Sequence, residues 1–296
     1  SFLKFNQALD QTIEMATLAM QNDQGLVGVP TGLSDLDEKL GGLHKSDLII
    51  LAGRPSMGKT AFAMNLAQDI VFNQKKKVGF FSLEMSAESI ALRMLSSLST
   101  VSQQKIRTGD YEKKAGETTA VTSALELMNE CEFYVDDTAG ISPMELRSKA
   151  RRLKRASGID VIIVDYLQLM SIPKFSENRV NEIGEVTRAL KALAKELDVP
   201  VIALSQLNRG VESRQDKRPF LSDLRESGSI EQDADVITFL YRDEVYNDDS
   251  KFKNMAEVIV AKHRNGPIGT INLTWIPHST TFQDYHPQVY GDGVVN

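Results

Sequence analysis

Residues 53–60 read Gly-Arg-Pro-Ser-Met-Gly-Lys-Thr and fit G-x-x-x-x-G-K-[ST], the pattern of a phosphate-binding loop. The apolar stretch 47–52 before it is typical of a buried strand, and the stretch 61–67 after it is typical of a helix. This strand–loop–helix context favours a true phosphate loop over a chance glycine turn, because the loop N–H groups and the helix N-terminus then face the phosphates together. The sequence predicts that Lys59 reaches the β and γ phosphates of a nucleotide and that the Thr60 hydroxyl ligates Mg²⁺.

Composition limits the classes to which the chain can belong. The 296 residues are 42% hydrophobic, which is enough for one large core or two modest ones. No apolar run is long enough to span a membrane, and the chain begins at Ser1 with no secretory leader and no initiator Met, as a fragment or a processed chain does. The single cysteine, Cys131, excludes an internal disulfide and a cysteine-based metal site, which suits a reducing cytosol. The net charge of −6 argues against a basic coat, but it leaves room for local loops that contact nucleic-acid phosphates.

A second apolar run, Val161-Ile162-Ile163-Val164, ends in Asp165. A strand that is apolar at every position is covered on both faces, which predicts a parallel sheet. Asp165 at the tip of this strand therefore suits a Mg²⁺ site opposite Thr60.

Three more polar side chains follow predicted strands or the helices next to them. Glu84 comes after the strand 78–82, where its carboxylate can polarise a water aimed at the γ phosphate or serve as an N-terminal charge of the next helix. Arg93, on that helix, points either to the phosphates or to solvent. Gln206 ends the strand that begins near Val199, where it can sense the γ phosphate.

Two basic features stand out in the acidic chain. Residues 208–228, called the basic segment below, form a long polar loop that includes Arg209, Arg214 and Arg225, and this loop is the best candidate for a polyanion contact. Lys262 and Arg264, called the cation pair below, are two apart at the end of a predicted strand, so they project to one face if extended. That face is either a solvated edge or a phosphate clamp.

The N-terminus predicts a separate element. Apolar residues at spacings of three and four indicate an amphipathic helix that docks either on its own domain or on a neighbouring subunit: Phe2, Phe5, Leu9, Ile13, Ala16 and Met20. We expect a linker helix over 1–24, the main domain over 25–286 with an antiparallel β ending, and a mobile tail over 287–296.

Six stretches in fixed order resemble the C-terminal motor domain of bacterial replicative DNA helicases of the DnaB type. They are GRPSMGKT (53–60), FSLEMS (81–86), VDYLQL (164–169), PVIALSQL (200–207), RESGSIEQDAD (225–235) and AKHRNGPIGT (261–270). The resemblance covers roughly residues 20–285. It implies an α/β fold of the RecA-like P-loop NTPase class, with a mostly parallel central sheet flanked by helices.

The resemblance also implies roles for individual residues. Glu84 is similar to the catalytic base, Asp165 to the Mg²⁺-site carboxylate, Gln206 to the γ-phosphate sensor, and Arg264 to an arginine finger that reaches a neighbouring subunit's nucleotide. The implied ATP contacts are Gly53, Arg54, Pro55, Ser56, Met57, Gly58, Lys59, Thr60, Ala61, Arg93, Lys262 and Arg264. The implied DNA contacts are Arg225, Glu226 and Gly228, beside Arg209 and Arg214 of the basic segment.

The resemblance further implies an ATP- and Mg²⁺-dependent homo-hexamer that moves 5′→3′ on single-stranded DNA and unwinds duplex at the replication fork. The implied partners are a helicase loader and a primase, the latter mainly through an N-terminal domain that has no counterpart in these residues. No membrane partner is expected, and the implied location is the bacterial cytoplasm, in association with the nucleoid.

Two other functions compete with this interpretation. A RecA-like recombination or branch-migration motor would coat DNA as a filament, and particle size would distinguish it from a ring. A nucleotide-gated assembly protein would set ring state without unwinding. Glu84 together with Arg264 argues against such a switch, because a switch needs no catalytic base and no finger.

Overall fold

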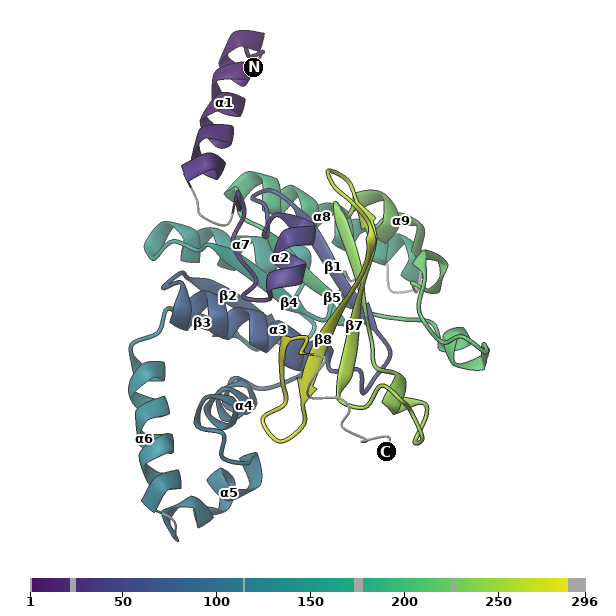
Figure 1. The fold of residues 1–296 in the computed structure, drawn as a ribbon. Coiled ribbons are helices and arrows are strands. Elements are labelled where there is room, and N and C mark those ends of the chain that lie inside the picture. Colours follow the sequence, from purple (N-terminus) through teal and green to yellow (C-terminus); the bar gives the residue numbers. More distant parts are fainter. Residues whose placement is uncertain (1, 22–24, 114, 173–177, 225–226, 287–296) are drawn as a thin grey trace.

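A mixed nine-stranded sheet forms the centre of the described chain (Figure 1). The computed structural model describes residues 2–21, 25–113, 115–172, 178–224 and 227–286. The strand order is β3-β2-β4-β5-β1-β6-β7-β8-β9. The strands are β1 (Leu48–Gly53), β2 (Val78–Ser82), β3 (Phe133–Asp136), β4 (Val161–Asp165), β5 (Val201–Gln206), β6 (Val236–Tyr241), β7 (Met255–His263), β8 (Gly269–Ile276) and β9 (Thr281–Asp284).

The six strands from β3 to β6 are parallel, as the apolar runs predict. Strand β1 is buried at each of its six residues. Its side chains alternate between two cores, because successive residues of a strand point to opposite faces. Leu48 and Ile50 pack into one core, and Ile49 and Leu51 pack into the other.

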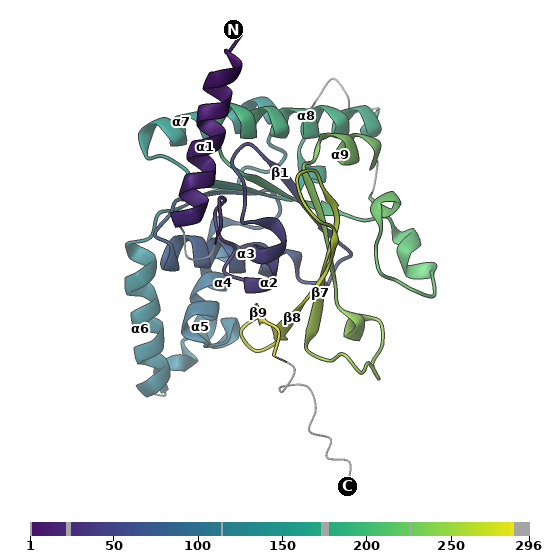
Figure 2. The same cartoon turned by 45° about the horizontal axis from the view of Figure 1, so that its top comes forward.

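Helices cover both faces of the sheet. Figure 2 shows α7, α8 and α9 on one side and α2, α3 and α4 on the other. The helices are α1 (Phe5–Gln21), α2 (Ser34–Leu40), α3 (Lys59–Gln68), α4 (Ala87–Ser99), α5 (Gln103–Thr108), α6 (Ala115–Asn129), α7 (Pro143–Ala156), α8 (Arg179–Leu197) and α9 (Ser227–Asp233). A π-helical turn (Asp69–Asn73) extends α3.

Local side-chain caps mark the starts of α4, α5, α7 and α8. Ser142 caps α7 by accepting a hydrogen bond from the Glu145 N–H at 3.2 Å, with Pro143 in the first turn. Helix α2 lacks a capping side chain of its own, because Leu33 stands at its N-cap. The carboxylate of Asp284, in β9, caps it instead by accepting from the Ser34 N–H and hydroxyl, both at 2.7 Å.

The predicted antiparallel ending is present and packs against α3. Strands β7, β8 and β9 follow β6 as antiparallel neighbours. Phe282 of β9 lies with its ring 5.3 Å from Phe62 and 4.7 Å from Trp275. Its N–H also donates to Asn65 at 3.0 Å. The C-terminal hairpin therefore fixes the helix that follows the phosphate loop.

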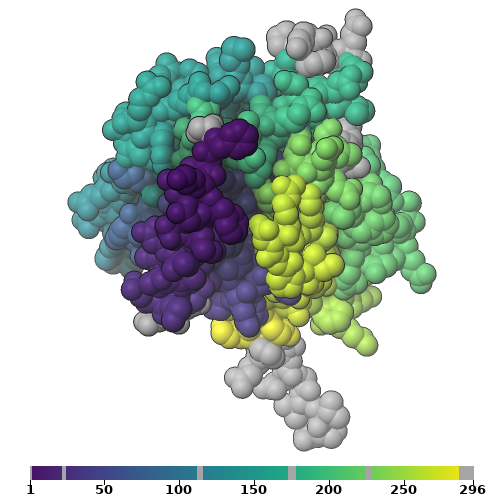
Figure 3. All heavy atoms as spheres, turned by 90° about the horizontal axis from the view of Figure 1, so that it is seen from above, coloured from purple at the N-terminus to yellow at the C-terminus, as the bar shows by residue number. Residues whose placement is uncertain are grey.

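Helix α1 is present as predicted, and none of its residues is buried. It projects away from the layers in Figure 1, and its purple spheres lie in front of the domain in Figure 3, which is seen from above. Phe5, Ile13 and Met20 are 83%, 57% and 86% exposed. Within the described part of the chain, this apolar stripe is not covered by the chain's own domain. None of the described helices has the length and apolar character needed to cross a membrane.

A tight backbone crossing joins the segment before α2 to the segment after it. Val29 and Leu43 exchange backbone hydrogen bonds at 2.9 and 2.7 Å. A Cβ placed on Gly28 would lie 2.6 Å from the Leu43 backbone, and backbone atoms cannot move aside as the end of a flexible side chain can. We predict that Gly28→Ala destabilises the fold by about 1–3 kcal/mol in urea unfolding.

Gly116, in α6, provides the matched control, because a Cβ there meets nothing within 4 Å. Gly116→Ala should be neutral or should stabilise the protein by up to about 1 kcal/mol. Equal effects of the two substitutions would contradict the account of this crossing.

Candidate functional site

The phosphate loop turns from the carboxyl end of β1 into the N-terminus of α3. Gly58, the N-cap of α3, has φ 95°, a conformation that favours glycine. A Cβ at Gly58 would lie 3.1 Å from the Phe282 ring. Ser56 also has a positive φ, 72°. The loop is therefore a tight turn held between the C-terminal hairpin and the sheet, and its helix end is suited to an anion.

Thr60 and Asp165 meet, as the sequence predicts. The Thr60 hydroxyl donates to Oδ2 of Asp165 at 2.9 Å. Asp165 is 3% exposed, and burial raises the pKa of its carboxyl. The charge of Glu84 raises that pKa as well, whereas the Thr60 hydrogen bond, Lys59 and Arg93 lower it. Glu84 and Arg93 therefore lie within electrostatic range of this pair.

A hydroxyl and a carboxylate are oxygen ligands of the kind that Mg²⁺ takes. Among the described residues there is no group of three or more His, Cys, Asp or Glu side chains that would hold a metal alone. The pair therefore fits a cation that is shared with ligand phosphates rather than an all-protein cage.

Lys59 lies within electrostatic range of Asp165. Its ammonium donates to the Ser205 carbonyl at 3.3 Å and is 6.0 Å from the centre of the Tyr166 ring. Burial lowers the pKa of Lys59 to about 8, and the charge of Arg54 also lowers it, against the opposing charges of Asp165 and Glu84. A polyanion bound here would supply the charge compensation that this lysine lacks.

Glu84 lies in the turn that links β2 to α4. Helix α4 begins at Ala87 with Ser86 as its cap, so Glu84 precedes the helix and is not one of its first-turn charges. The Leu83 N–H donates to the Asp165 carbonyl at 2.9 Å, which holds this turn against the end of β4. Glu84 itself is exposed.

Arg93 and Gln206 each lie next to a residue of the phosphate loop or of the helix that follows it. Arg93 is half-buried and lines a small recess with Ala61, so its side chain is not fully in solvent. Gln206 ends β5 directly beside Gly53 in the parallel register. Its N–H donates to Oε1 of Gln168 at 3.2 Å. Gln168 is a residue that the sequence analysis did not identify as functional.

Arg54 points away from the open side of the loop. It is 9% exposed, and its guanidinium donates to Glu212 and to the Leu207 carbonyl, both at 3.0 Å. Pro55 and Ser56 are exposed, whereas Met57 is 1% exposed. Arg54 therefore joins the phosphate loop to the basic segment, and its side chain is not directed at a ligand.

Arg242 contacts the phosphate loop from the end of β6, and no motif in the sequence indicated it. Its guanidinium donates to the Ser56 carbonyl at 3.3 Å and stacks on Trp275 at 4.4 Å. Its N–H donates to the Met57 sulfur at 3.2 Å. It packs the loop against the antiparallel strands.

The cation pair lies at the other end of the parallel strands, where these strands begin. His263, between its two members, is paired with Val236, the first residue of β6. The phosphate loop follows the last residue of β1, and β6 runs parallel to β1. The length of a strand therefore separates Lys262 and Arg264 from the phosphate loop of their own chain.

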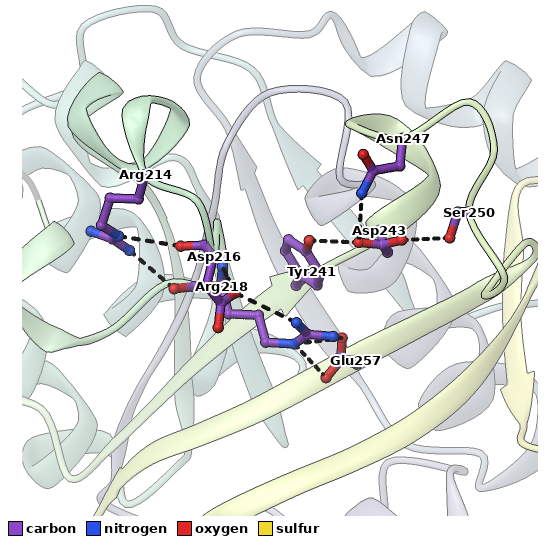
Figure 4. A network of polar contacts seen from close by, with 8 residues as sticks. All are labelled: Arg214, Asp216, Arg218, Tyr241, Asp243, Asn247, Ser250 and Glu257. Atoms are coloured by element: carbon purple, nitrogen blue, oxygen red, sulfur yellow. Dashed lines mark hydrogen bonds and ion pairs between the residues drawn. The ribbon is translucent and has the colours of Figure 1, made fainter.

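The basic segment is more ordered than a long loop. It contains two 3₁₀ turns (Arg209–Ser213 and Leu221–Asp223) and is pinned by a bridge between Leu207 and Leu224. Arg214 makes two hydrogen bonds with Asp223, at 2.5 and 2.7 Å. Figure 4 shows Arg214 also donating to the backbone of the segment and Arg218 donating to Glu257 of β7. The segment is therefore folded onto the sheet by its own arginines.

The predicted DNA contacts fall into four groups. Arg209 is exposed, and within the described residues its side chain has no hydrogen bond or ion pair. Arg214 is held in the internal ion pair, and the ion pair raises the pKa of its guanidinium. Gly228 lies in the first turn of α9, whereas Arg225 and Glu226 lie outside the described residues.

The family model that describes a DnaB-like helicase C-terminal domain matches residues 28–284. The chain belongs to this family. The replicative DNA helicase DnaB of Buchnera aphidicola (from Acyrthosiphon pisum) is 52% identical over 286 residues, which cover 96% of this chain and 62% of that protein. DnaB of Geobacillus stearothermophilus is 47% identical over 283 residues, which cover 95% of this chain and 62% of that protein. The chain thus spans about three fifths of the length of these relatives.

Two solved structures superimpose on the fold. An isolated ATPase domain matches with a TM-score of 0.90 and 39% identity, covering 97% of this chain and 100% of that one. A DnaB-like replicative helicase, whose structure addresses its interactions with primase, matches with a TM-score of 0.87 and 40% identity, covering 97% of this chain and 68% of that one. The predicted family and the RecA-like fold are confirmed.

The raised pKa of Asp165 has a consequence for stability. Because the folded-state pKa lies above the ordinary value of 3.8, the folded protein holds this proton more tightly than the unfolded chain does. Stability is therefore lost as pH rises from about that value through the folded-state pKa. Asp165→Asn removes the buried charge, so we predict a variant that is more stable than the parent at pH 7.5 without ligand, with a gain that shrinks as pH falls toward 4.

Thermal unfolding across this pH range measures the effect. Asp248→Asn, at an exposed turn, is the control and should leave the unfolding temperature unchanged. An Asp165→Asn variant that is less stable than the parent at pH 7.5 would contradict the assignment of an uncompensated carboxylate.

Proposed function

We propose that this chain is the motor domain of an ATP-dependent replicative DNA helicase, which works as a homo-hexameric ring. The observation that carries the proposal is that the phosphate loop lies at the carboxyl ends of the parallel strands, whereas the cation pair lies at their amino ends. A complete hydrolysis site needs the phosphate loop of one subunit and the cation pair of the next, because a single chain holds them a strand length apart. Family membership supports the same assignment.

The proposed chemistry is positioning and charge neutralisation at the γ phosphate. The phosphate loop and Lys59 hold the phosphates, and Glu84 orients the attacking water. A Mg²⁺ ion held by Thr60 and Asp165 would neutralise charge on the phosphate oxygens. Arg264 of the next subunit offsets the charge that develops in the transition state, and Gln206 senses the γ phosphate.

Assembly into a ring would cover the exposed apolar stripe of α1. We propose that residues 1–24 are a linker helix that docks on the adjacent subunit and that 25–286 form the motor. The exposed Phe5, Ile13 and Met20 support this, because a contiguous apolar stripe is stable in water only when it is covered. Burying such side chains would contribute about 1.5–3 kcal/mol each to assembly.

We further propose that the ring translocates 5′→3′ on single-stranded DNA and unwinds the duplex at the fork. The partners would be a loader and a primase, the latter mainly through an N-terminal domain outside these residues. The setting would be the bacterial cytoplasm at the nucleoid. Unwinding of a forked duplex by the chain, with the N-terminal domain restored, tests this function, and ATP hydrolysis without unwinding would contradict it.

The first prediction from this function concerns the finger. Arg264→Ala should leave ATP affinity within a few fold and lower the ATP turnover rate by about 10³-fold or more, because an arginine finger acts mainly in the transition state. Arg155→Ala, at an exposed position of α7, is the charge-matched control and should turn over at the parent rate. Turnover of Arg264→Ala at the parent rate would show that Arg264 is not an arginine finger.

The second prediction concerns DNA. Among the described residues of the basic segment, Arg209 is the exposed arginine, so Arg209→Ala should weaken single-stranded DNA binding and reduce the slope of log affinity against log salt by about 0.7, the value for one lost phosphate contact. Fluorescence anisotropy across a salt series measures this slope. Arg107→Ala, on α5, is the control, and an unchanged slope for Arg209→Ala would place the DNA contact elsewhere.

A further inference from the structure

Both members of the cation pair bind one short stretch of the chain. The Lys262 ammonium donates to the Glu231 carbonyl, and the Arg264 guanidinium donates to the Gln232 carbonyl at 3.1 Å. These carbonyls lie in the last turn of α9, where unsatisfied carbonyls attract cations. The two side chains therefore project from the end of β7 toward the same segment.

Asp235 gives Arg264 its most specific contacts. Oδ1 of Asp235 accepts from Arg264 at 3.0 Å, and the Asp235 carbonyl accepts from the Arg264 N–H at 2.8 Å. The Asp235 side chain is 5% exposed, whereas that of Arg264 is 45% exposed. The buried carboxylate and the Gln232 carbonyl thus hold the two terminal nitrogens of the guanidinium, while nearly half of the side chain remains exposed.

Asp235 is itself fixed by the rigid part of the fold. Its Oδ2 accepts from the Lys191 ammonium at 2.6 Å and from the Leu48 N–H at 2.8 Å. Its own N–H donates to the Leu48 carbonyl at 2.9 Å. Leu48 is the first residue of β1, and the phosphate loop leaves the other end of that strand.

We propose that Asp235 is the positioning residue for Arg264, and this inference rests on the proposed function. A free arginine side chain loses rotamer entropy when it is ordered. By holding Arg264 before the neighbouring nucleotide arrives, Asp235 reduces that loss at the moment of reaction. Because Asp235 is bonded to the start of β1, the finger is tied to the strand that carries its own subunit's phosphate loop.

A purely structural role for Asp235 would have a different signature. Asp235 also joins β1 to α8, so Asp235→Asn can lower stability without affecting Arg264. A structural defect damages the subunit that carries it. A finger defect damages only the site of the neighbouring subunit, and an intact finger from another chain repairs it.

The experiment is a subunit-mixing assay on the full chain. Asp235→Asn alone should keep ATP affinity within a few fold and lower turnover by about 10–10²-fold, the loss expected from a misplaced catalytic group. When it is mixed with Lys59→Ala, which is inactive itself but carries an intact finger, turnover should rise above that of either variant alone. The recovered activity arises at sites that combine an Asp235→Asn phosphate loop with a Lys59→Ala finger.

Two controls make every outcome decisive. Gly28→Ala lowers stability at a backbone crossing that does not contact Asp235, and it should keep turnover near the parent rate. Arg264→Ala mixed with Lys59→Ala should also recover activity. If this second mixture fails to recover, the proposed shared site is wrong. If it recovers and the Asp235→Asn mixture does not, or if Gly28→Ala loses as much turnover as Asp235→Asn, the positioning role is overturned.

Should Asp235→Asn fail to fold, Asp235→Glu keeps the charge and moves the carboxylate by one methylene. The positioning role then predicts a folded protein with reduced turnover that recovers in the mixture with Lys59→Ala. Parent turnover by Asp235→Glu, or a loss that does not recover in the mixture, would overturn the role.

Discussion

Strand β1 lies between two parallel neighbours and is buried at each of its residues. The geometry at both ends of the parallel strands depends on this constraint. A strand in that position cannot slip by one residue, because a slip would exchange its two apolar faces between the two cores. The direction of β1 therefore decides where the phosphate loop lies. Leu48 and Arg264 both donate to the Asp235 carboxylate. Through these bonds β1 also decides where Arg264 lies, at the amino ends of the parallel strands.

The charges follow from the same burial. Asp165 and Lys59 are placed at the end of a buried strand and on the first turn of α3, where water is largely excluded. Burial raises the pKa of the carboxyl and lowers the pKa of the ammonium to about 8, so neither charge is fully compensated by the protein. Such a site is costly without ligand and is stabilised by a bound polyanion and cation, a common feature of functional sites.

The sequence predicted the features that local signals encode. Apolar runs identified β1 and β4, because periodicity acts within a few residues. The loop motif and the strand-end carboxylate together predicted the meeting of Thr60 with Asp165. The contacts that were missed join distant residues. Examples are the Asp284 cap of α2, the stacking of Arg242 on Trp275, and the pairing of Arg218 with Glu257. No local pattern marks such partners, because tertiary packing alone brings them together.

The central claim is that hydrolysis needs two subunits, and the dependence of ATP turnover on protein concentration tests it most directly. Turnover per subunit would be measured over a dilution series while light scattering reports the fraction assembled. The account predicts that turnover per subunit rises with the assembled fraction and that a dispersed monomer hydrolyses ATP poorly. Equal turnover per subunit in the monomer and in the assembly would contradict it.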